Sequence, residues 1–223
     1  GDDTRQWGPP FVSVDGDGSE ESLYFLATNR GKRSMTLNLS DSRGQKVVHE
    51  LAAHCDVVVE NFKVGALARY GLDYETLKEI NPSLVYCSIT GFGQTGPYAD
   101  RAGYDFMIQA MGGLMSVTGE AEDVAGTNPQ KVGVAIADLV TGLYSANAIQ
   151  TALIHRERTG QGQYIDMALL DCQVAILANQ AMTYLAAGQT PVRMGNAHPN
   201  IVPYQVFETQ DGHIILAVGN DGQ

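Results

Sequence analysis

The sequence predicts an α/β fold built on a parallel sheet. Three short runs rich in β-branched and apolar residues, at 56–60, 84–89 and 164–168, are typical of buried parallel strands. Helical patterns lie between these runs along the chain, and this alternation predicts right-handed crossovers. With 223 residues, 44% of them hydrophobic, the chain is large enough for one sizeable domain and part of another.

The first elements are read from turn residues and periodicity. Residues 1–19 are rich in Gly, Asp and Pro and predict a loop. Residues 32–39 alternate polar and apolar side chains, which predicts a half-buried strand. Ser40 and Asp41 are then expected to cap a helix that runs to about Ala53.

The central elements follow from apolar runs and helix breakers. The strand at 56–60 is followed by a helix predicted at 74–80, which Asn81 and Pro82 end. The next strand is predicted at 84–89. A glycine-rich loop at 91–97 comes directly after it.

The second half of the chain predicts two long helices and a hairpin. A short helix at 104–111 and a surface loop at 120–131 precede a long helix at 134–158, which ends in cationic residues and Gly160. A strand at 164–168 leads into a second long helix at 170–186, stopped by Gly188. Residues 202–209 and 213–218 predict a hairpin.

Composition excludes several classes of function. A net charge of −11, from 14 Lys and Arg against 25 Asp and Glu, argues against a nucleic-acid partner. No apolar run approaches the roughly 20 residues of a membrane span. The three cysteines show no metal-ligand spacing, so we expect no metal, reduced thiols in the core and a cytoplasmic location. The missing initiator Met suggests that the sequence begins inside a longer protein.

Residues 59–69 are the first candidate for chemistry. They leave a buried strand and enter a short helix, and ligands in open α/β sheets bind at the carboxyl ends of strands. Lys63 and Arg69 lie where they could hold a phosphate group. A plain turn with solvated cations is the alternative.

Two further segments could take part. Glycines in residues 91–105 would let the backbone approach a ligand closely, although a long loop closed by Asp105 explains the pattern as well. Asp171 falls where the strand at 164–168 passes into a helix, whose positive end would keep its carboxylate ionised. Taken alone, an Asp at such a position is also an ordinary helix cap.

Taken in order, these segments resemble the family III CoA-transferases, of the formyl-CoA and carnitinyl-CoA transferase type. The likeness covers essentially the whole chain, and its motifs lie at residues 23–25, 29–34, 59–62, 65–67, 91–97, 103–105, 109–113, 159–163 and 168–171. The resemblance implies an interlocked homodimer whose subunits each have a Rossmann-like large domain and a smaller one. Residues 1–200 would then form most of the large domain, without its N-terminal strand and helix, and residues 201–223 would begin the small domain.

The resemblance also implies the site residues. Asp171 matches the family's catalytic aspartate, and Tyr104 and Asp105 would lie in the reaction pocket. Residues that would contact coenzyme A are Leu37, Asn38, Leu39, Ser40, Asn61, Phe62, Lys63, Ala66, Arg69, Ala102, Gly103, Tyr104 and Asp105. Some members cover the aspartate with a run of glycines, but the comparable residues 195–200 contain one glycine.

The implied reaction moves CoA from an acyl-CoA donor to a small carboxylic acid. Asp171 would form a mixed anhydride and then an aspartyl-CoA thioester, which divides one hard exchange into easier steps. An α-methylacyl-CoA racemase is one alternative, but racemisation needs a pair of proton-transfer groups, and Tyr104 stands where racemases typically have His. A non-catalytic CoA-binding protein is the other. The donor and the acceptor acid are not readable from the sequence.

Overall fold

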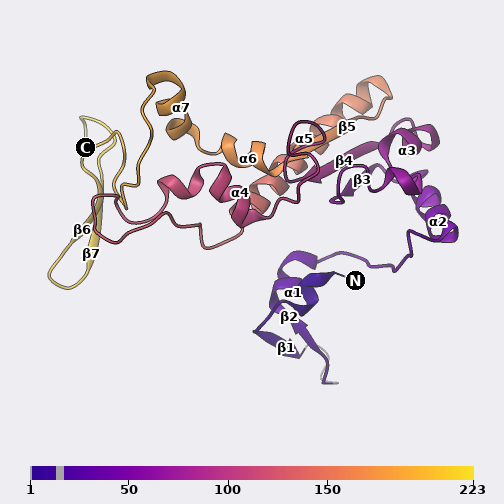
Figure 1. Ribbon diagram of the computed structural model, residues 1–223, viewed down its shortest axis with the longest axis horizontal. Helices are drawn as coiled ribbons and strands as arrows, with labels where there is room; N and C mark the ends of the chain where they lie inside the picture. Colours follow the sequence, from indigo (N-terminus) through magenta and orange to yellow (C-terminus); the bar gives the residue numbers. More distant parts are fainter. Residues whose placement is uncertain (1, 14–17) are drawn as a thin grey trace. The chain divides into compact units, whose positions relative to one another are not determined.

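The computed structural model describes residues 2–13 and 18–223 (Figure 1). The chain divides into two compact units, Gly1–Lys46 and Val47–Gln223, and each is described by itself. This division differs from the boundary predicted between residues 200 and 201, which stays a prediction.

The first unit contains more regular structure than the predicted loop. A 3-10 helix, η1 (Asp3–Gln6), precedes an antiparallel pair of strands, β1 (Phe11–Ser13) and β2 (Glu20–Ser22). Helix α1 (Leu23–Asn29) follows directly, and the buried Ser22 caps it by accepting a 3.1 Å hydrogen bond from the Tyr24 N–H. Part of the loop prediction for residues 1–19 was therefore wrong, and residues 14–17 lie outside the described residues.

The strand predicted at residues 32–39 was also wrong. These residues have irregular backbone, and only Leu37 and Leu39 are partly buried. Alternation is a property of one segment, whereas a strand also needs a neighbour that takes its backbone hydrogen bonds. Among the described residues, no strand pairs with this segment.

The second unit is built on a parallel sheet of three strands, β3 (Val57–Glu60), β4 (Val85–Thr90) and β5 (Tyr164–Ala168). The strands lie in the order β3-β4-β5, and both neighbouring pairs are parallel. This arrangement confirms the predicted α/β class and all three predicted strands. It also brings the carboxyl ends of the three strands to the same edge of the sheet.

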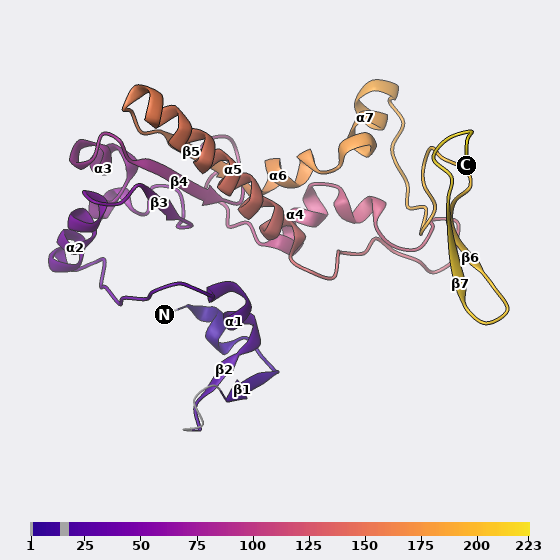
Figure 2. The same cartoon turned by 180° about the vertical axis from the view of Figure 1, so that it is seen from behind.

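Helices cover both faces of this sheet. On one face, α2 (Ser42–Ala52) and α3 (Tyr74–Ile80) contribute Ala52 and Leu77 to a core with Tyr86. On the other face lies α5 (Ile136–Thr159), which both views show running along the strands (Figures 1 and 2). The helices predicted at 74–80 and 134–158 are thus confirmed.

The cysteines divide between the core and the surface. Cys87 and Cys172 are buried, and burial raises the pKa of both thiols. Cys55 is exposed, which contradicts its predicted place in the core. It follows the end of α2, where the chain turns towards β3 at the surface.

The second long helix is two helices. α6 (Leu169–Ala175) and α7 (Ala178–Ala187) are separated at residues 176–177, and Ala178 adopts a left-handed φ of 47°. The segment contains no glycine or proline at the break, so its sequence predicts one continuous helix. The single helix predicted at 170–186 was therefore wrong, because helix propensity alone does not decide the backbone conformation at residues 176–178.

Of the remaining elements, helix α4 (Asp105–Met111) and the hairpin match the predictions. Two short 3-10 helices were not predicted: η2 (Ala68–Tyr70), between β3 and α3, and η3 (Leu114–Val117), after α4. The predicted hairpin is confirmed as β6 (Tyr204–Glu208) and β7 (His213–Ala217), paired antiparallel. Over residues 2–13 and 18–223, none of the helices is both long and apolar enough to cross a membrane.

Candidate functional site

Two glycines meet at the carboxyl edge of the sheet. Gly91 follows β4 directly, and Gly103 precedes α4. A Cβ atom placed on Gly91 would lie 2.5 Å from the Cα atom of Gly103, so the two main chains are in direct contact and leave no room for a side chain. The carbonyl oxygen of Gly91 also accepts a 3.1 Å hydrogen bond from the Leu170 N–H. The loop after β4 is therefore joined at this point to the loop before α4 and to the first turn of α6 (Leu169–Ala175), the helix that follows β5.

A cavity of about 210 Å³ opens beside this junction. The residues that line it come from the turn after β3, the end of β4 and the loop before α4: Asn61, Phe62, Lys63, Val64, Thr90, Gly91, Ala99, Asp100, Arg101, Ala102, Gly103 and Tyr104. Six of these were predicted to contact a ligand, in two segments about 40 residues apart in the sequence. The structure brings these two segments together.

The turn after β3 is held by hydrogen bonds to the sheet. The Asn61 side-chain amide donates to the carbonyl oxygen of Ile89, with 2.6 Å between the two atoms. The Phe62 N–H donates to the Glu60 carboxylate at 2.7 Å. These bonds fix the cavity wall to β3 and β4, and Phe62 remains about half exposed at the cavity.

Two cations line the cavity. Lys63 stands on one wall, and Arg101 on the other has its guanidinium 4.3 Å from the centre of the Tyr98 ring. Asp100 is an anion beside them. Paired cations at a cavity mouth suit phosphate groups. Arg101 was not among the predicted ligand contacts, although a cation next to the predicted stretch 102–105 is the signal that could have found it.

Other predicted contacts lie elsewhere. Neither Ala66 nor Arg69 lines the cavity. The Arg69 Nε donates to the carbonyl oxygen of Ala66 at 3.1 Å, and its guanidinium lies 4.9 Å from the centre of the Tyr70 ring. The stretch from Leu37 to Ser40 belongs to the first unit, so its contact with a ligand stays a prediction.

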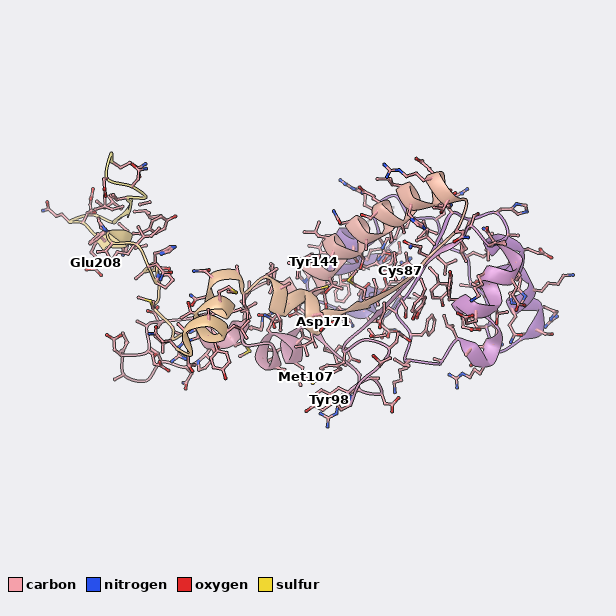
Figure 3. The ribbon with its side chains drawn as sticks, turned by 90° about the horizontal axis from the view of Figure 1, so that it is seen from above. Cys87, Tyr98, Met107, Tyr144, Asp171 and Glu208 are labelled. Carbon is pink, nitrogen blue, oxygen red and sulfur yellow. The ribbon has the colours of Figure 1, made fainter. Side chains whose placement is uncertain are left out.

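Asp171 is the third residue of α6, directly after β5 (Figure 3). Its side chain is exposed, and it makes no hydrogen bond or ion pair with any residue that the structure describes. The first turn of α6 has no side-chain cap. The alternative that Asp171 is an ordinary helix cap is therefore not what this geometry shows. The main-chain N–H of its neighbour Leu170 donates a hydrogen bond to the carbonyl oxygen of Gly91, which lines the cavity.

Asp105 is tied into the fold by both carboxylate oxygens. One accepts a 2.7 Å hydrogen bond from the side-chain amide of Gln109, and the other accepts a 2.8 Å bond from the main-chain N–H of Ala137 at the start of α5. Gln109, fully buried, in turn accepts from the Val132 N–H at 2.9 Å. Asp105 thus caps a helix distant in the sequence, which no local pattern reveals. Tyr104, by contrast, is 74% exposed at the cavity.

We expect Asp105→Ala to destabilise the protein. The change removes a charged acceptor from two donors and leaves the Ala137 N–H at the start of α5 without its partner, which costs about 2 kcal/mol of the free energy of unfolding. Urea unfolding measures the loss. Asp123→Ala, at an exposed acid in the 120–131 loop, is the control and should change the free energy of unfolding little. Equal stabilities of the two variants would contradict the capping role.

The described residues contain no cluster of three or more His, Cys, Asp or Glu side chains suited to a metal ion. In the 195–200 loop, His198 Nδ1 accepts hydrogen bonds from the N–H groups of Asn200 and Ile201, at 3.0 and 3.1 Å. This histidine shapes its own turn and packs 5.0 Å from the Tyr204 ring.

Comparison with known proteins identifies relatives over the full chain. A model of CoA-transferase family III matches residues 1–223. The chain is 61% identical to a succinate–glutarate CoA-transferase of Agrobacterium fabrum and 49% identical to the succinyl-CoA:glutarate CoA-transferase of Homo sapiens, in each case over 100% of this chain. These alignments cover 55% and 49% of the two relatives, so the chain spans about half their length.

A solved structure agrees with the fold. The crystal structure of a CAIB/BAIF family protein from Brucella suis is 63% identical in sequence and superposes with a TM-score of 0.89. It is matched over 100% of this chain and 57% of its own. The narrower formyl-CoA or carnitinyl-CoA type stays a prediction, but the family is shown: the chain belongs to CoA-transferase family III.

Proposed function

We propose that the protein transfers CoA from an acyl-CoA thioester to a free carboxylic acid, with Asp171 as the nucleophile. The observation that carries this proposal is the free carboxylate of Asp171, exposed in the first turn of α6 and one residue after Leu170, which is bonded to the cavity wall. A carboxylate without hydrogen-bond partners is available for attack. Thioesters are reactive enough to accept such a weak nucleophile.

The exchange proceeds in balanced steps. A carboxylate oxygen of Asp171 attacks the thioester carbonyl, the C–S bond breaks, and a mixed anhydride and CoA thiolate result. The thiolate attacks the Asp171 carbonyl carbon, which releases the donor acid and leaves an aspartyl-CoA thioester. The acceptor carboxylate attacks that same carbon and expels the thiolate, and the thiolate then attacks the acyl carbon of the new anhydride. The new thioester leaves, and Asp171 is a carboxylate again.

We further propose that the 210 Å³ cavity binds coenzyme A. Its lining supplies the two cations Lys63 and Arg101, which suit the phosphate groups of this ligand, and the exposed ring of Phe62, which suits its apolar parts. Asn61, Ala102, Gly103 and Tyr104 complete the contacts.

Lys63→Ala and Arg101→Ala should each weaken CoA binding by about tenfold, because each removes one cation from the phosphate groups. The difference in CoA affinity between the wild type and each variant should become smaller as the salt concentration is raised, since added ions screen the attraction between the cation and the phosphate groups in the wild type. Titration of CoA into the full-length protein at two salt concentrations measures both effects. Lys131→Ala, at an exposed cation outside the cavity, is the control. Unchanged affinity in both cavity variants would contradict this assignment.

For substrates we propose a short dicarboxylic acid pair, with succinyl-CoA as donor and glutarate as acceptor. The support is that the two reported CoA-transferase relatives carry these acids in their names. A panel of acceptors with succinyl-CoA, from two-carbon to six-carbon diacids and their hydroxy derivatives, tests the choice. The largest kcat/KM is expected for glutarate, and a preference for a monocarboxylic acid would overturn it.

Trapping the intermediate tests the chemistry. The full-length protein, incubated with succinyl-CoA and no acceptor, should carry CoA covalently on the peptide that contains Asp171, detected by mass spectrometry after rapid acid quenching. Added glutarate should remove the label. A label on another residue, or CoA exchange without any covalent label, would overturn the role of Asp171.

The racemase alternative is disfavoured by the geometry. Asp105, the acid beside Tyr104, has both oxygens engaged in hydrogen bonds to Gln109 and Ala137. A tyrosine beside a carboxylate whose oxygens are both hydrogen-bonded is a poor pair for removing and returning a proton at an α-carbon.

We propose in addition that the protein acts as a homodimer in the cytoplasm. Light scattering of the full-length protein and cell fractionation test these two points.

A further inference from the structure

Three polar side chains lie side by side across the carboxyl half of the sheet. Glu60 of β3 pairs in register with Ser88 of β4, and Ser88 pairs with Asp166 of β5. Residues that pair in parallel strands point to the same face, so the three side chains form one row. Ser88 is only 2% exposed. The proposed transfer uses none of the three.

Gln94 of the glycine-rich loop completes this row. Its side-chain amide donates to the Ser88 hydroxyl oxygen at 2.9 Å, and its main-chain N–H donates to the Asp166 carboxylate at 3.0 Å. The Ser88 hydroxyl donates to one oxygen of Glu60. The other Glu60 oxygen accepts from the Phe62 N–H at 2.7 Å. We name these four residues, Glu60, Ser88, Gln94 and Asp166, the cross-strand network.

The cross-strand network connects one wall of the cavity with the glycine-rich loop, which leads on to the other wall at residues 99–104. At one end it holds Phe62, in the turn after β3. At the other end it holds the loop that begins at Gly91, whose carbonyl oxygen is bonded to Leu170 beside Asp171. The separation of the two walls is therefore set through Ser88 and Gln94, at the centre of the network.

Stability alone is a weak reason for such a network. Glu60 is only partly buried and Asp166 is exposed, so water competes for their hydrogen bonds, which then contribute little net free energy to folding. What a satisfied polar network does provide is a single arrangement of the segments it joins. We propose that Ser88 and Gln94 are positioning residues, which set the spacing of the cavity walls and thereby the affinity for the CoA thioester. This inference rests on the proposed function.

Two substitutions of nearly equal size separate the hydroxyl from the volume at position 88. Ser88→Thr keeps the hydroxyl, whereas Ser88→Val replaces it with a methyl group, so both carry the same steric change. In the full-length protein, Ser88→Val should have a KM for succinyl-CoA at least about tenfold above that of Ser88→Thr, because it loses both hydrogen bonds of the hydroxyl, to Glu60 and from Gln94. The KM for the acceptor acid and kcat should agree within about twofold between the two variants, because Asp171 makes no hydrogen bond with the network.

Gln94→Met tests the loop side of the network, because methionine keeps the length of the side chain and removes its amide. The same rise in KM for succinyl-CoA is expected. Gln161→Met is the matched control, at an exposed glutamine whose side chain makes no hydrogen bond among the described residues, and its KM should equal that of the wild type.

The outcomes are distinguishable. A purely structural network would lower the unfolding temperature of Ser88→Val and Gln94→Met and leave both KM values unchanged, which overturns the inference while the proposed function stands. If the Ser88 variants fail to fold, Gln94→Met decides alone. If the wild-type protein neither binds CoA nor exchanges it between acids, the proposed function is wrong, and this inference is wrong with it.

Discussion

Replacing Asp171 with asparagine is expected to reduce CoA exchange by at least about 10³-fold, because an amide of the same shape cannot attack a thioester. The fold should not change. Asp171 is exposed and has no hydrogen-bond partner among the described residues, so the substitution breaks no contact that holds α6 in place. CoA binding should also stay within about twofold of wild type, since Asp171 does not line the cavity.

Three measurements on the full-length protein check this expectation: the rate of product thioester formation, the unfolding temperature and the affinity for CoA. Asp171→Ala should behave in the same way, and it excludes recovery of activity by slow hydrolysis of the new amide. Asp211→Asn, in the turn of the β6–β7 hairpin, is the control for a change of charge at an exposed acid. Retention of more than about a tenth of the rate in both Asp171 variants would falsify the nucleophile assignment.

The sheet could be predicted from the sequence because its signals are local. The runs that became β3, β4 and β5 are short, rich in apolar residues and bounded by turn residues. Only β4 is buried along nearly its whole length, whereas β3 is partly buried and β5 has exposed residues at alternate positions, so the sequence predicted the strands but not their burial. The segment at 32–39 has an equally clear alternating pattern, but it has no partner strand among the described residues. Pairing is a long-range property, which one segment does not encode.

The candidate site was predictable in part for the same reason. Residues 59–69, with Lys63, were singled out because they follow a strand at the expected edge of the sheet, whereas Asn61 and Gly103 were named as ligand contacts only through the resemblance to the family. The role of Asp105 was not found, since its partner Ala137 lies 32 residues away in the sequence. The hydrogen bonds of Ser88 and Gln94 were missed because a buried serine in an apolar strand gives no signal of its own.

The two glycines at the carboxyl edge give the largest expected effect on stability. Gly91→Ala would place a Cβ atom 2.5 Å from the Cα and 2.7 Å from the N atom of Gly103. Both are main-chain atoms, so no rotamer change relieves the contact, and one loop must move. We expect a loss of about 2–4 kcal/mol in the free energy of unfolding.

Gly142→Ala separates this steric effect from a general effect of adding a methyl group. Gly142 is an exposed residue within α5 with open space around its Cα atom, so alanine there should stabilise the protein by about 0.5–1 kcal/mol. Urea unfolding of the two variants should therefore give changes of opposite sign. Gly91 also lines the cavity and bonds to Leu170, so the shift that relieves its clash should raise the KM for the CoA thioester as well. If Gly91→Ala is as stable as wild type, the main chains at Gly91 and Gly103 are not in contact. The connection of Gly91 to Leu170 then no longer explains why Asp171 lies next to the cavity wall.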